Sequence, residues 1–270
     1  MLLGTCPIVS ERSTHGDATK LWELDSQKEL AHSGIMHSRC GCFDLCSPWF
    51  SLAPHPDNSL HHEPGQFPVP AVCLHHVFSR GDGFQDKVYT LIIQRLGPKV
   101  NGNLLDIGSG NGVLAVKLAQ QHLELEVVGI DYWGKDWEYS KRVCEKNAQL
   151  VHVASRVHFQ KGDAAALDFA DNTFDGVVSN LTFHEVKSVA DKREVVREAL
   201  RVVKPEGAST FVDYFYGKRY YGSASAFESY LRSLNLSQFE LKPLHHVMAI
   251  PVLLRHPKIF GKAGIVYGRK

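Results

Sequence analysis

Acidic residues and glycines gather at two points in the middle of the chain. The segment LLDIGSGNGV places Asp106 ahead of Gly108, Gly110 and Gly112. Glycines at a turn between a strand and a helix let the backbone approach a ligand closely, because no Cβ stands in the way. A second acid, Asp131, closes the segment LEVVGID, 23 residues after Gly108. A carboxylate at that spacing can accept hydrogen bonds from both hydroxyls of a ribose, so the two features predict a nucleoside site.

The glycine loop departs from the dinucleotide-binding fingerprint. In G-x-G-x-x-G the third glycine permits tight packing of helix on strand, but the position counted from Gly108 and Gly110 is Val113. This argues against a dinucleotide oxidoreductase. The pattern present, D-x-G-x-G-x-G with an acid two residues before the first glycine, resembles motif I of class I S-adenosylmethionine-dependent methyltransferases.

The resemblance covers about residues 84–270 and implies S-adenosylmethionine as the cofactor. It implies that Asp106 orients the methionine end, that Asp131 binds the ribose, and that Asp163 takes the exocyclic amine of the adenine. Tyr132 and Trp133 either lie against the adenosine or pack in the protein. The residues assigned to the cofactor in this way are Asp106, Gly108, Ser109, Gly110, Asn111, Gly112, Asp131, Tyr132, Trp133, Asp163, Ala164, Asn180 and Leu181.

The segments FDGVVSNLTFHEV and REALRVVKPEG extend the likeness to the broad small-molecule family that includes the ubiquinone and menaquinone methyltransferases. The family usually has two glycines after the proline of the second segment, and Glu206 replaces the first of them. We therefore expect Gly207 to take any positive φ that this turn requires.

Methyl transfer from a sulfonium is an in-line displacement, and a base is needed only if the acceptor carries a proton. His184, next to Glu185 just beyond the expected fourth strand, is the candidate catalytic base, because imidazole titrates near neutral pH. The alternative is a histidine that packs or caps a helix.

The acceptor is expected to be a small molecule. SNLT stands where many methyltransferases of planar amino groups have Asn-Pro-Pro-aromatic, and the net charge of +1 shows no basic excess, so a nucleic-acid partner is not expected. The rival function is a Rossmann-like module that binds S-adenosylmethionine or another nucleoside without catalysis. The sequence gives no indication of the oligomeric state.

Strands and helices alternate from residue 84 onward. Strands are expected at LLDI, LEVVGID, RVHFQ, FDGVVSN and STFVDYF, with helices at 84–96, 113–119, 137–150 and 191–203. This order predicts a Rossmann-like, doubly wound α/β domain at 80–270 with a mainly parallel seven-stranded sheet. FELKPL and GIVYG are expected to form an antiparallel hairpin at its edge, with no helix required between them.

Residues 1–79 hold five of the six cysteines and show no sustained periodicity, so we expect an irregular extension. A zinc site at Cys40, Cys42 and Cys46 is not expected, because C-x-C-x3-C lacks the paired C-x2-C spacing. Without a basic signal start or a long apolar run, the chain is expected to be cytoplasmic and to lack a transmembrane segment.

Residues 241–270 carry six Lys or Arg and no acid. We interpret this basic tail as a solvated edge. An anionic substrate or a membrane surface is the alternative partner.

Overall fold

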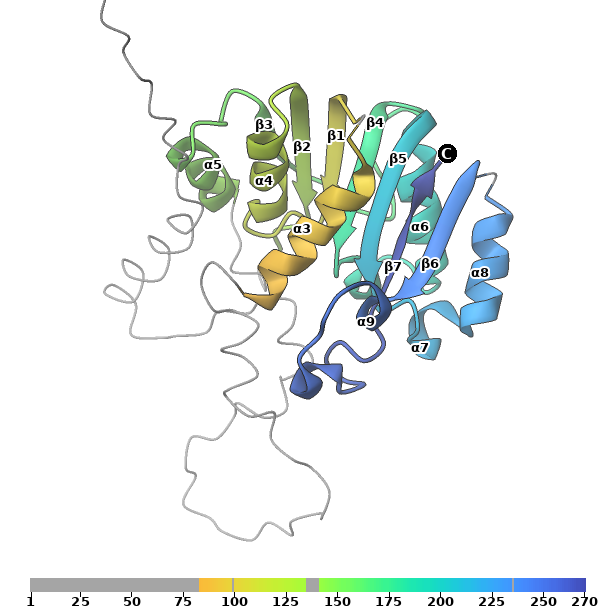
Figure 1. Ribbon diagram of the computed structural model, residues 1–270. Helices are drawn as coiled ribbons and strands as arrows, with labels where there is room; N and C mark the ends of the chain where they lie inside the picture. The colour runs from red at the N-terminus through yellow and green to blue at the C-terminus, as the bar shows by residue number, and fades with distance from the viewer. Residues whose placement is uncertain (1–82, 99, 135–140, 235) are drawn as a thin grey trace, which may run out of the picture.

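The computed structural model of the protein describes residues 83–98, 100–134, 141–234 and 236–270. A seven-stranded sheet with helices on both faces forms this part of the chain (Figure 1), which confirms the expected α/β class. The predicted extension at 1–79, with its cysteines and histidines, lies outside the described residues. No helix within the described ranges is both long enough and apolar enough to cross a bilayer.

The sheet has the order β3-β2-β1-β4-β5-β7-β6. Pairing is parallel from β3 to β5, whereas β7 lies antiparallel between β5 and β6. The strands are β1 (Gly102–Ile107), β2 (Leu125–Asp131), β3 (Val157–Lys161), β4 (Phe174–Asn180), β5 (Val203–Asp213), β6 (Gln238–Pro243) and β7 (Gly264–Arg269). All the parallel strands therefore end at one edge of the sheet, which we call the carboxyl edge.

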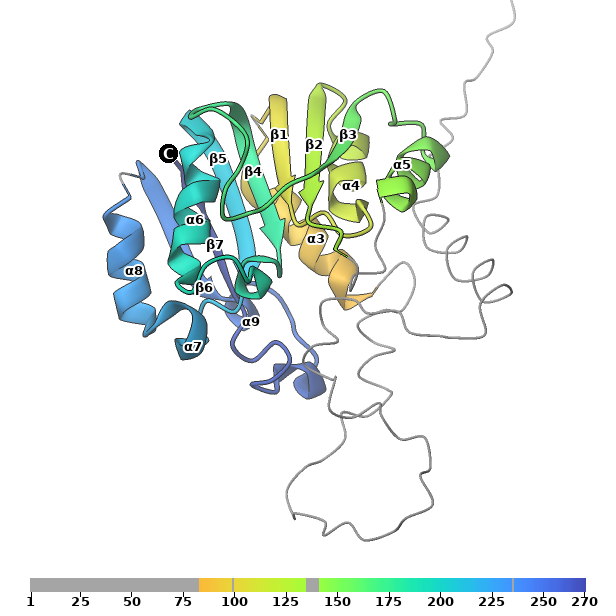
Figure 2. The ribbon, with the colours of Figure 1, turned by 180° about the vertical axis from the view of Figure 1, so that it is seen from behind.

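Two layers of helices cover the sheet. The helices in front of the sheet in Figure 1 are α3 (Phe84–Leu96), α4 (Val113–Gln121) and α5 (Lys141–Leu150). The helices in front of it in Figure 2 are α6 (Lys192–Arg201), α7 (Lys218–Tyr221) and α8 (Ala224–Arg232). Three short helical turns, η2 (Phe183–Glu185), α9 (Leu244–Val247) and η3 (Val252–Arg255), lie in connections.

Adjacent residues of β1 enter opposite layers of the core. Leu104 packs in the cluster that contains Leu114 of α4, while Leu105 packs in the cluster that contains Val196 of α6. Side chains alternate across a strand, so a central strand covered on both faces needs apolar residues in succession. This explains why LLDI is an uninterrupted run up to its acid.

The expected elements differ from the structure mainly at their ends. Of the helix expected over 137–150, the structure shows Lys141–Leu150, and residues 137–140 lie outside the described ranges. The helix expected over 191–203 spans Lys192–Arg201. Asp191 caps its start by accepting a hydrogen bond from the backbone N–H of Arg193 at 3.0 Å, and Val203 already belongs to β5. Between the last two strands, where no helix was required, α9 and η3 are present.

The turn at Glu206 corrects one expectation. The positive φ of +62° falls on Glu206, and not on Gly207. A Cβ on Gly207 would lie 2.7 Å from Cγ1 of Val203 and 2.8 Å from the carbonyl oxygen of Lys204. Glycine is thus required at 207 by close packing. A hydrogen bond to the end of the chain holds Glu206 in its left-handed conformation, since the N–H of Glu206 donates to the carbonyl of Lys270 at 2.9 Å.

The variant Glu206→Gly is expected to be more stable than the wild type. A left-handed conformation costs a non-glycine residue roughly 1–2 kcal/mol, and glycine removes this cost. Part of the gain in stability is lost, because glycine also raises the conformational entropy of the unfolded chain. A net gain of about 1 kcal/mol should raise the midpoint of thermal unfolding by about 2–4 °C. The control is Glu206→Ala, which keeps the Cβ and hence the strain. A similar rise in both variants would contradict the backbone explanation.

Candidate functional site

The carboxyl edge brings together the residues that the sequence singled out. Asp106 is the next-to-last residue of β1, Asp131 ends β2 and Asn180 ends β4, and these strands are neighbours in the sheet. The glycine loop that follows β1 is attached to β2 by its backbone. The N–H groups of Gly108 and Ser109 both donate to the carbonyl of Ile130, at 2.8 and 3.0 Å.

The three glycines of the loop all have positive φ, but they do not all serve the same purpose. A Cβ on Gly108 would overlap the side chain of Thr182, at 1.9 Å from its Oγ1. A Cβ on Gly112 would lie 2.6 Å from Cζ of Phe159. A Cβ on Gly110 would meet no atom of the described residues within 4 Å. Gly108 and Gly112 are therefore needed for packing within the protein, whereas Gly110 faces open space.

Asp131 holds the loop in place. Its Oδ2 accepts a hydrogen bond from the N–H of Gly110 at 2.9 Å, and its Oδ1 accepts one from the N–H of Trp133 at 3.3 Å. An ionised carboxylate has about four acceptor positions, so these two bonds leave capacity for further donors. The predicted contact with a ribose remains a prediction, and the structure adds a loop-positioning role that the sequence did not reveal.

Side chains of helix α5 hold the same loop by hydrogen bonds to its backbone. The thiol of Cys144 donates to the carbonyl of Gly110 at 3.1 Å, and the side-chain amide of Asn147 donates to the carbonyl of Asn111 at 2.9 Å. Burial, followed by the charges of Asp131 and Asp106, raises the pKa of the Cys144 thiol. This cysteine is thus a hydrogen-bond donor rather than a thiolate. The sequence gave one usable signal, a polar Asn147 in the buried row of an amphipathic helix.

Asp106 is a buried acid that lacks a complete set of partners. Its side-chain Oδ2 has no hydrogen-bond partner in the described part of the chain. Burial, together with the nearby charge of Asp131, raises the pKa of Asp106 to about 7. An unpaired buried acceptor is unfavourable. A cationic ligand group at this carboxylate would offset that penalty, as the amino group of a methionine moiety would.

Asn180 shows the same feature at the end of β4. Its Oδ1 is buried, and it too has no partner within the described ranges. The next residue, Leu181, has a positive φ of +54°, and its N–H donates to the carbonyl of Val212 at 2.7 Å. The chain therefore turns sharply off β4 beside Gly108.

The segment predicted to contact adenine is tightly folded. Asp163 accepts hydrogen bonds from the N–H of Ala165 at 2.9 Å and from the hydroxyl of Ser188 at 3.2 Å, and Ala164 is buried. The two aromatic residues after β2 lie differently from each other. Trp133 packs partly buried and donates from Nε1 to the carbonyl of Gly110 at 3.4 Å, whereas Tyr132 is 60% exposed.

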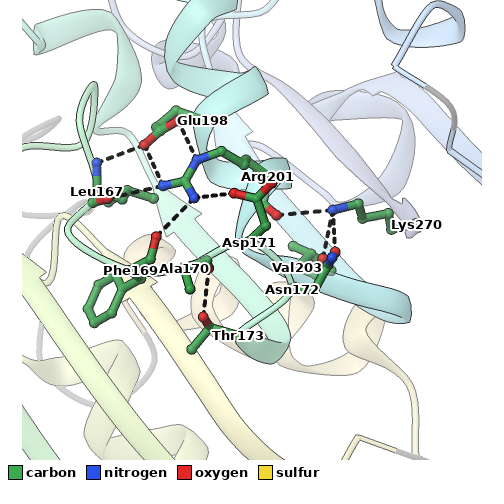
Figure 3. Close-up of polar contacts among 10 residues, drawn as sticks. All are labelled: Leu167, Phe169, Ala170, Asp171, Asn172, Thr173, Glu198, Arg201, Val203 and Lys270. Carbon is green, nitrogen blue, oxygen red and sulfur yellow. Dashed lines mark hydrogen bonds and ion pairs between the residues drawn. The ribbon is translucent and has the colours of Figure 1, made fainter.

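A polar network beneath this segment, shown in Figure 3, fixes its position. The guanidinium of Arg201 on α6 donates to the carbonyls of Leu167 and Phe169, at 3.0 and 2.9 Å, and pairs with Asp171 at 2.6 Å. Glu198, one turn earlier, accepts from the N–H of Leu167 at 2.8 Å. Helix α6 thus holds the loop between β3 and β4 through its backbone, which no motif in the sequence indicates.

His184 lies on η2 and forms a pair with an acid from the next strand. Its Nδ1 is 2.9 Å from Oδ1 of Asp213, which ends β5 and is fully buried. Oδ2 of Asp213 also accepts from the backbone N–H of His184 at 3.3 Å, and Oε1 of Glu185 lies 3.6 Å from Nε2. Burial by itself lowers the pKa of His184, but Asp213 and then Glu185 outweigh it, so the pKa is raised above 6.5.

The partner of His184 was missed in the sequence. Nothing in the sequence pairs Asp213, in the expected fifth strand, with His184. The separation of 29 positions carries no spacing signal, and it is the parallel pairing of β4 with β5 that brings the two residues together. In the described ranges, no cluster of three or more His, Cys, Asp or Glu is arranged to hold a metal ion.

Comparison with known proteins identifies the domain. Residues 105–211 match the family model described as a methyltransferase domain. The ubiquinone/menaquinone biosynthesis C-methyltransferase of Geotalea uraniireducens is 27% identical over 117 residues, which cover 42% of this chain and 46% of that protein. The 27-O-demethylrifamycin SV methyltransferase of Amycolatopsis mediterranei is 30% identical over 156 residues, covering 58% and 51%. The chain thus spans about half the length of these curated relatives.

Among solved structures, phosphoethanolamine N-methyltransferase 2 of Haemonchus contortus, in complex with S-adenosyl-L-methionine, has a TM-score of 0.51 at 17% identity. The match covers 70% of this chain and 53% of that one, and it shows a shared fold. The chain carries a class I S-adenosylmethionine-dependent methyltransferase domain and is a distant homologue of the ubiquinone/menaquinone methyltransferases. The family and its cofactor are those that the sequence predicted.

The variant Asp106→Asn is expected to change how stability depends on pH. Because the pKa of Asp106 is raised from 3.8 to about 7, the folded protein holds a proton that the unfolded chain has released. The wild type therefore loses stability as pH rises from about 4 to about 7, by up to about 4 kcal/mol from this group. In urea unfolding without cofactor, the free energy of unfolding of Asp106→Asn should increase relative to that of the wild type as the pH rises over this range. A constant difference between the two proteins would contradict the assignment.

Proposed function

We propose that this chain is an enzyme that transfers a methyl group from S-adenosylmethionine to a small molecule. The observation that carries the proposal is the fully buried Oδ2 of Asp106, which has no partner within the described ranges. The loop that follows Asp106 contains Gly110, where an added Cβ would face open space among the described residues. The family match over residues 105–211 supports the same function.

The residues of the carboxyl edge fit the cofactor. We assign Asp106 to the amino-acid end, the backbone from Gly108 to Gly112 to the close approach, and Asp131 to the ribose. Asp163 and the N–H of Ala164 are assigned to the adenine, with Asn180 and Leu181 where cofactor and acceptor meet. When bound, S-adenosylmethionine supplies an electrophilic methyl group on a sulfonium, so the protein contributes alignment and exclusion of water.

The His184–Asp213 pair gives the proposal a general base. A carboxylate can only accept, so the neutral imidazole places its proton on Nδ1 toward Asp213 and leaves Nε2 as the basic nitrogen. A proton taken from the acceptor at Nε2 is stabilised by Asp213 at 2.9 Å and by Glu185 at 3.6 Å. We infer an acceptor whose nucleophilic atom carries a proton. This arrangement favours an enzyme over a module that only binds the cofactor.

Calorimetry tests the cofactor site directly. We expect the wild type to bind S-adenosylmethionine and S-adenosylhomocysteine and not NAD. Gly110→Val should lose at least about tenfold in affinity, equivalent to about 1.4 kcal/mol, because its side chain fills the open space beside the loop. The matched control is Gly222→Val, since Gly222 also has a positive φ and open space around its Cβ but lies between α7 and α8. If both variants lost affinity for S-adenosylmethionine equally, backbone strain and not a filled cofactor site would be the cause.

Labelled-methyl transfer into a metabolite extract, with the product identified by mass, tests catalysis. With the acceptor in hand, His184→Gln is expected to lower kcat by about 100- to 10,000-fold while leaving the affinity for S-adenosylmethionine unchanged. In the wild type, kcat should rise with pH through the raised pKa of His184. Asp213→Asn should move this rise to lower pH, because the group that raises the pKa is lost. Full turnover in His184→Gln would remove the base from the mechanism.

A further inference from the structure

The connection between β6 and β7 forms a surface that the proposed chemistry does not use. It runs from Leu244 to Ala263 and contains α9 and η3. Pro243 pairs with Gly264, and Gly264 pairs with Asp213 at the end of β5. The β6–β7 connection therefore leaves the sheet at the carboxyl edge, on the same side as the His184–Asp213 pair.

This connection is a folded unit. Leu254 and Phe260 are buried, and the N–H of Phe260 donates to the carbonyl of Leu254 at 3.0 Å. The two ends of the segment are joined, since the N–H of Leu244 donates to the carbonyl of Ala263 at 3.0 Å. The ring of Phe260 meets the ring of Phe84 edge to face, with centroids 4.6 Å apart. The direction of its exposed side chains is thus fixed by the fold.

Two large apolar side chains stand out from this unit in succession. Val252 is 80% exposed and Leu253 is 55% exposed, on the short turn η3 that follows Pro251. Single exposed apolar residues are ordinary on protein surfaces. An adjacent pair held outward by a closed turn is a feature that apolar contact with a partner would bury.

The charged residues of the β6–β7 connection all have the same sign. Between Leu244 and Ala263 the sequence has no acid, and the basic residues Arg255, Lys258 and Lys262 are all exposed. Apolar side chains that project among Lys and Arg are typical of surfaces that bind the interface of a bilayer. A second copy of the chain suits this surface poorly, because it would bring three further cations against the first three.

We propose that the β6–β7 connection docks the protein on an anionic lipid surface. Val252 and Leu253 enter the headgroup region, while Arg255, Lys258 and Lys262 lie against the lipid phosphates. Both forces act on the same short segment, and neither apolar burial nor charge has to be sufficient alone. Docking in this way turns the carboxyl edge toward the lipid. It requires neither the cofactor nor methyl transfer, so it stands or falls independently of the proposed function.

Co-sedimentation of the full chain with vesicles tests this proposal. We expect binding to vesicles of phosphatidylcholine mixed with phosphatidylserine, weakened by salt, and little binding to phosphatidylcholine alone. The double variant Val252→Ser/Leu253→Ser should lower the partition coefficient roughly tenfold or more. The double variant Lys258→Glu/Lys262→Glu should lower the partition coefficient by at least about fivefold for each positive charge removed.

The matched control is Leu123→Ser, because Leu123 is 75% exposed but precedes β2 at the opposite edge of the sheet. It should bind like the wild type, and thermal unfolding of each variant shows whether the fold is intact. Equal binding to both kinds of vesicle, or wild-type binding by the two double variants, would overturn the proposal. Self-association without lipid that Val252→Ser/Leu253→Ser abolishes would overturn it in favour of a dimer surface.

Discussion

The parallel pairing of β1 with β2 and of β4 with β5 is the constraint on which the rest of this molecule depends. Parallel strands end at the same edge, so side chains distant in sequence meet there without any local signal. Asp106 and Asp131 are 25 positions apart in the chain, yet the charge of Asp131 helps to raise the pKa of Asp106. The same rule joins His184 to Asp213 across the next pair of strands.

The edge is arranged at a cost in stability. Asp106 is buried with an unpaired oxygen, Asn180 has a second unpaired oxygen, and Leu181 takes a left-handed conformation without being glycine. Each feature is unfavourable by itself in a protein without a ligand. The surrounding structure compensates in two ways. The side chains of Cys144 and Asn147 donate hydrogen bonds to backbone carbonyls of the glycine loop, and the Arg201 network holds the segment that follows Asp163.

The two ends of the edge differ in chemistry. The end formed by β1 and β2 has acids, glycines and a close-packed helix, which suit a polar ligand with a cationic group. The end formed by β5, β6 and β7 has the buried His184–Asp213 pair and, beyond it, a basic connection with exposed Val252 and Leu253. A single edge thus places a polar site and an amphipathic surface side by side, because β6 and β5 run in the same direction on either side of β7.

The sequence by itself determined the class of fold, the family and the cofactor, because these depend on local patterns. LLDIGSGNG, the acid at 131 and the alternation of strands and helices are all encoded within short windows. Element ends were less well determined, as at Asp191, where a capping side chain rather than apolar periodicity sets the start of the helix. The expectation at Gly207 was wrong because close packing, which no local pattern reports, required glycine at that position.

Only the tertiary structure decided which residues face one another. The bond from Asp131 to Gly110, the support of Cys144 beneath the loop, and the partner of His184 all join separate elements of the sheet and its helices. Likewise, a basic tail in the sequence does not reveal that Val252 and Leu253 point outward while Leu254 and Phe260 anchor the turn. Contacts of this kind arise from strand order and packing, and these are properties of the whole chain.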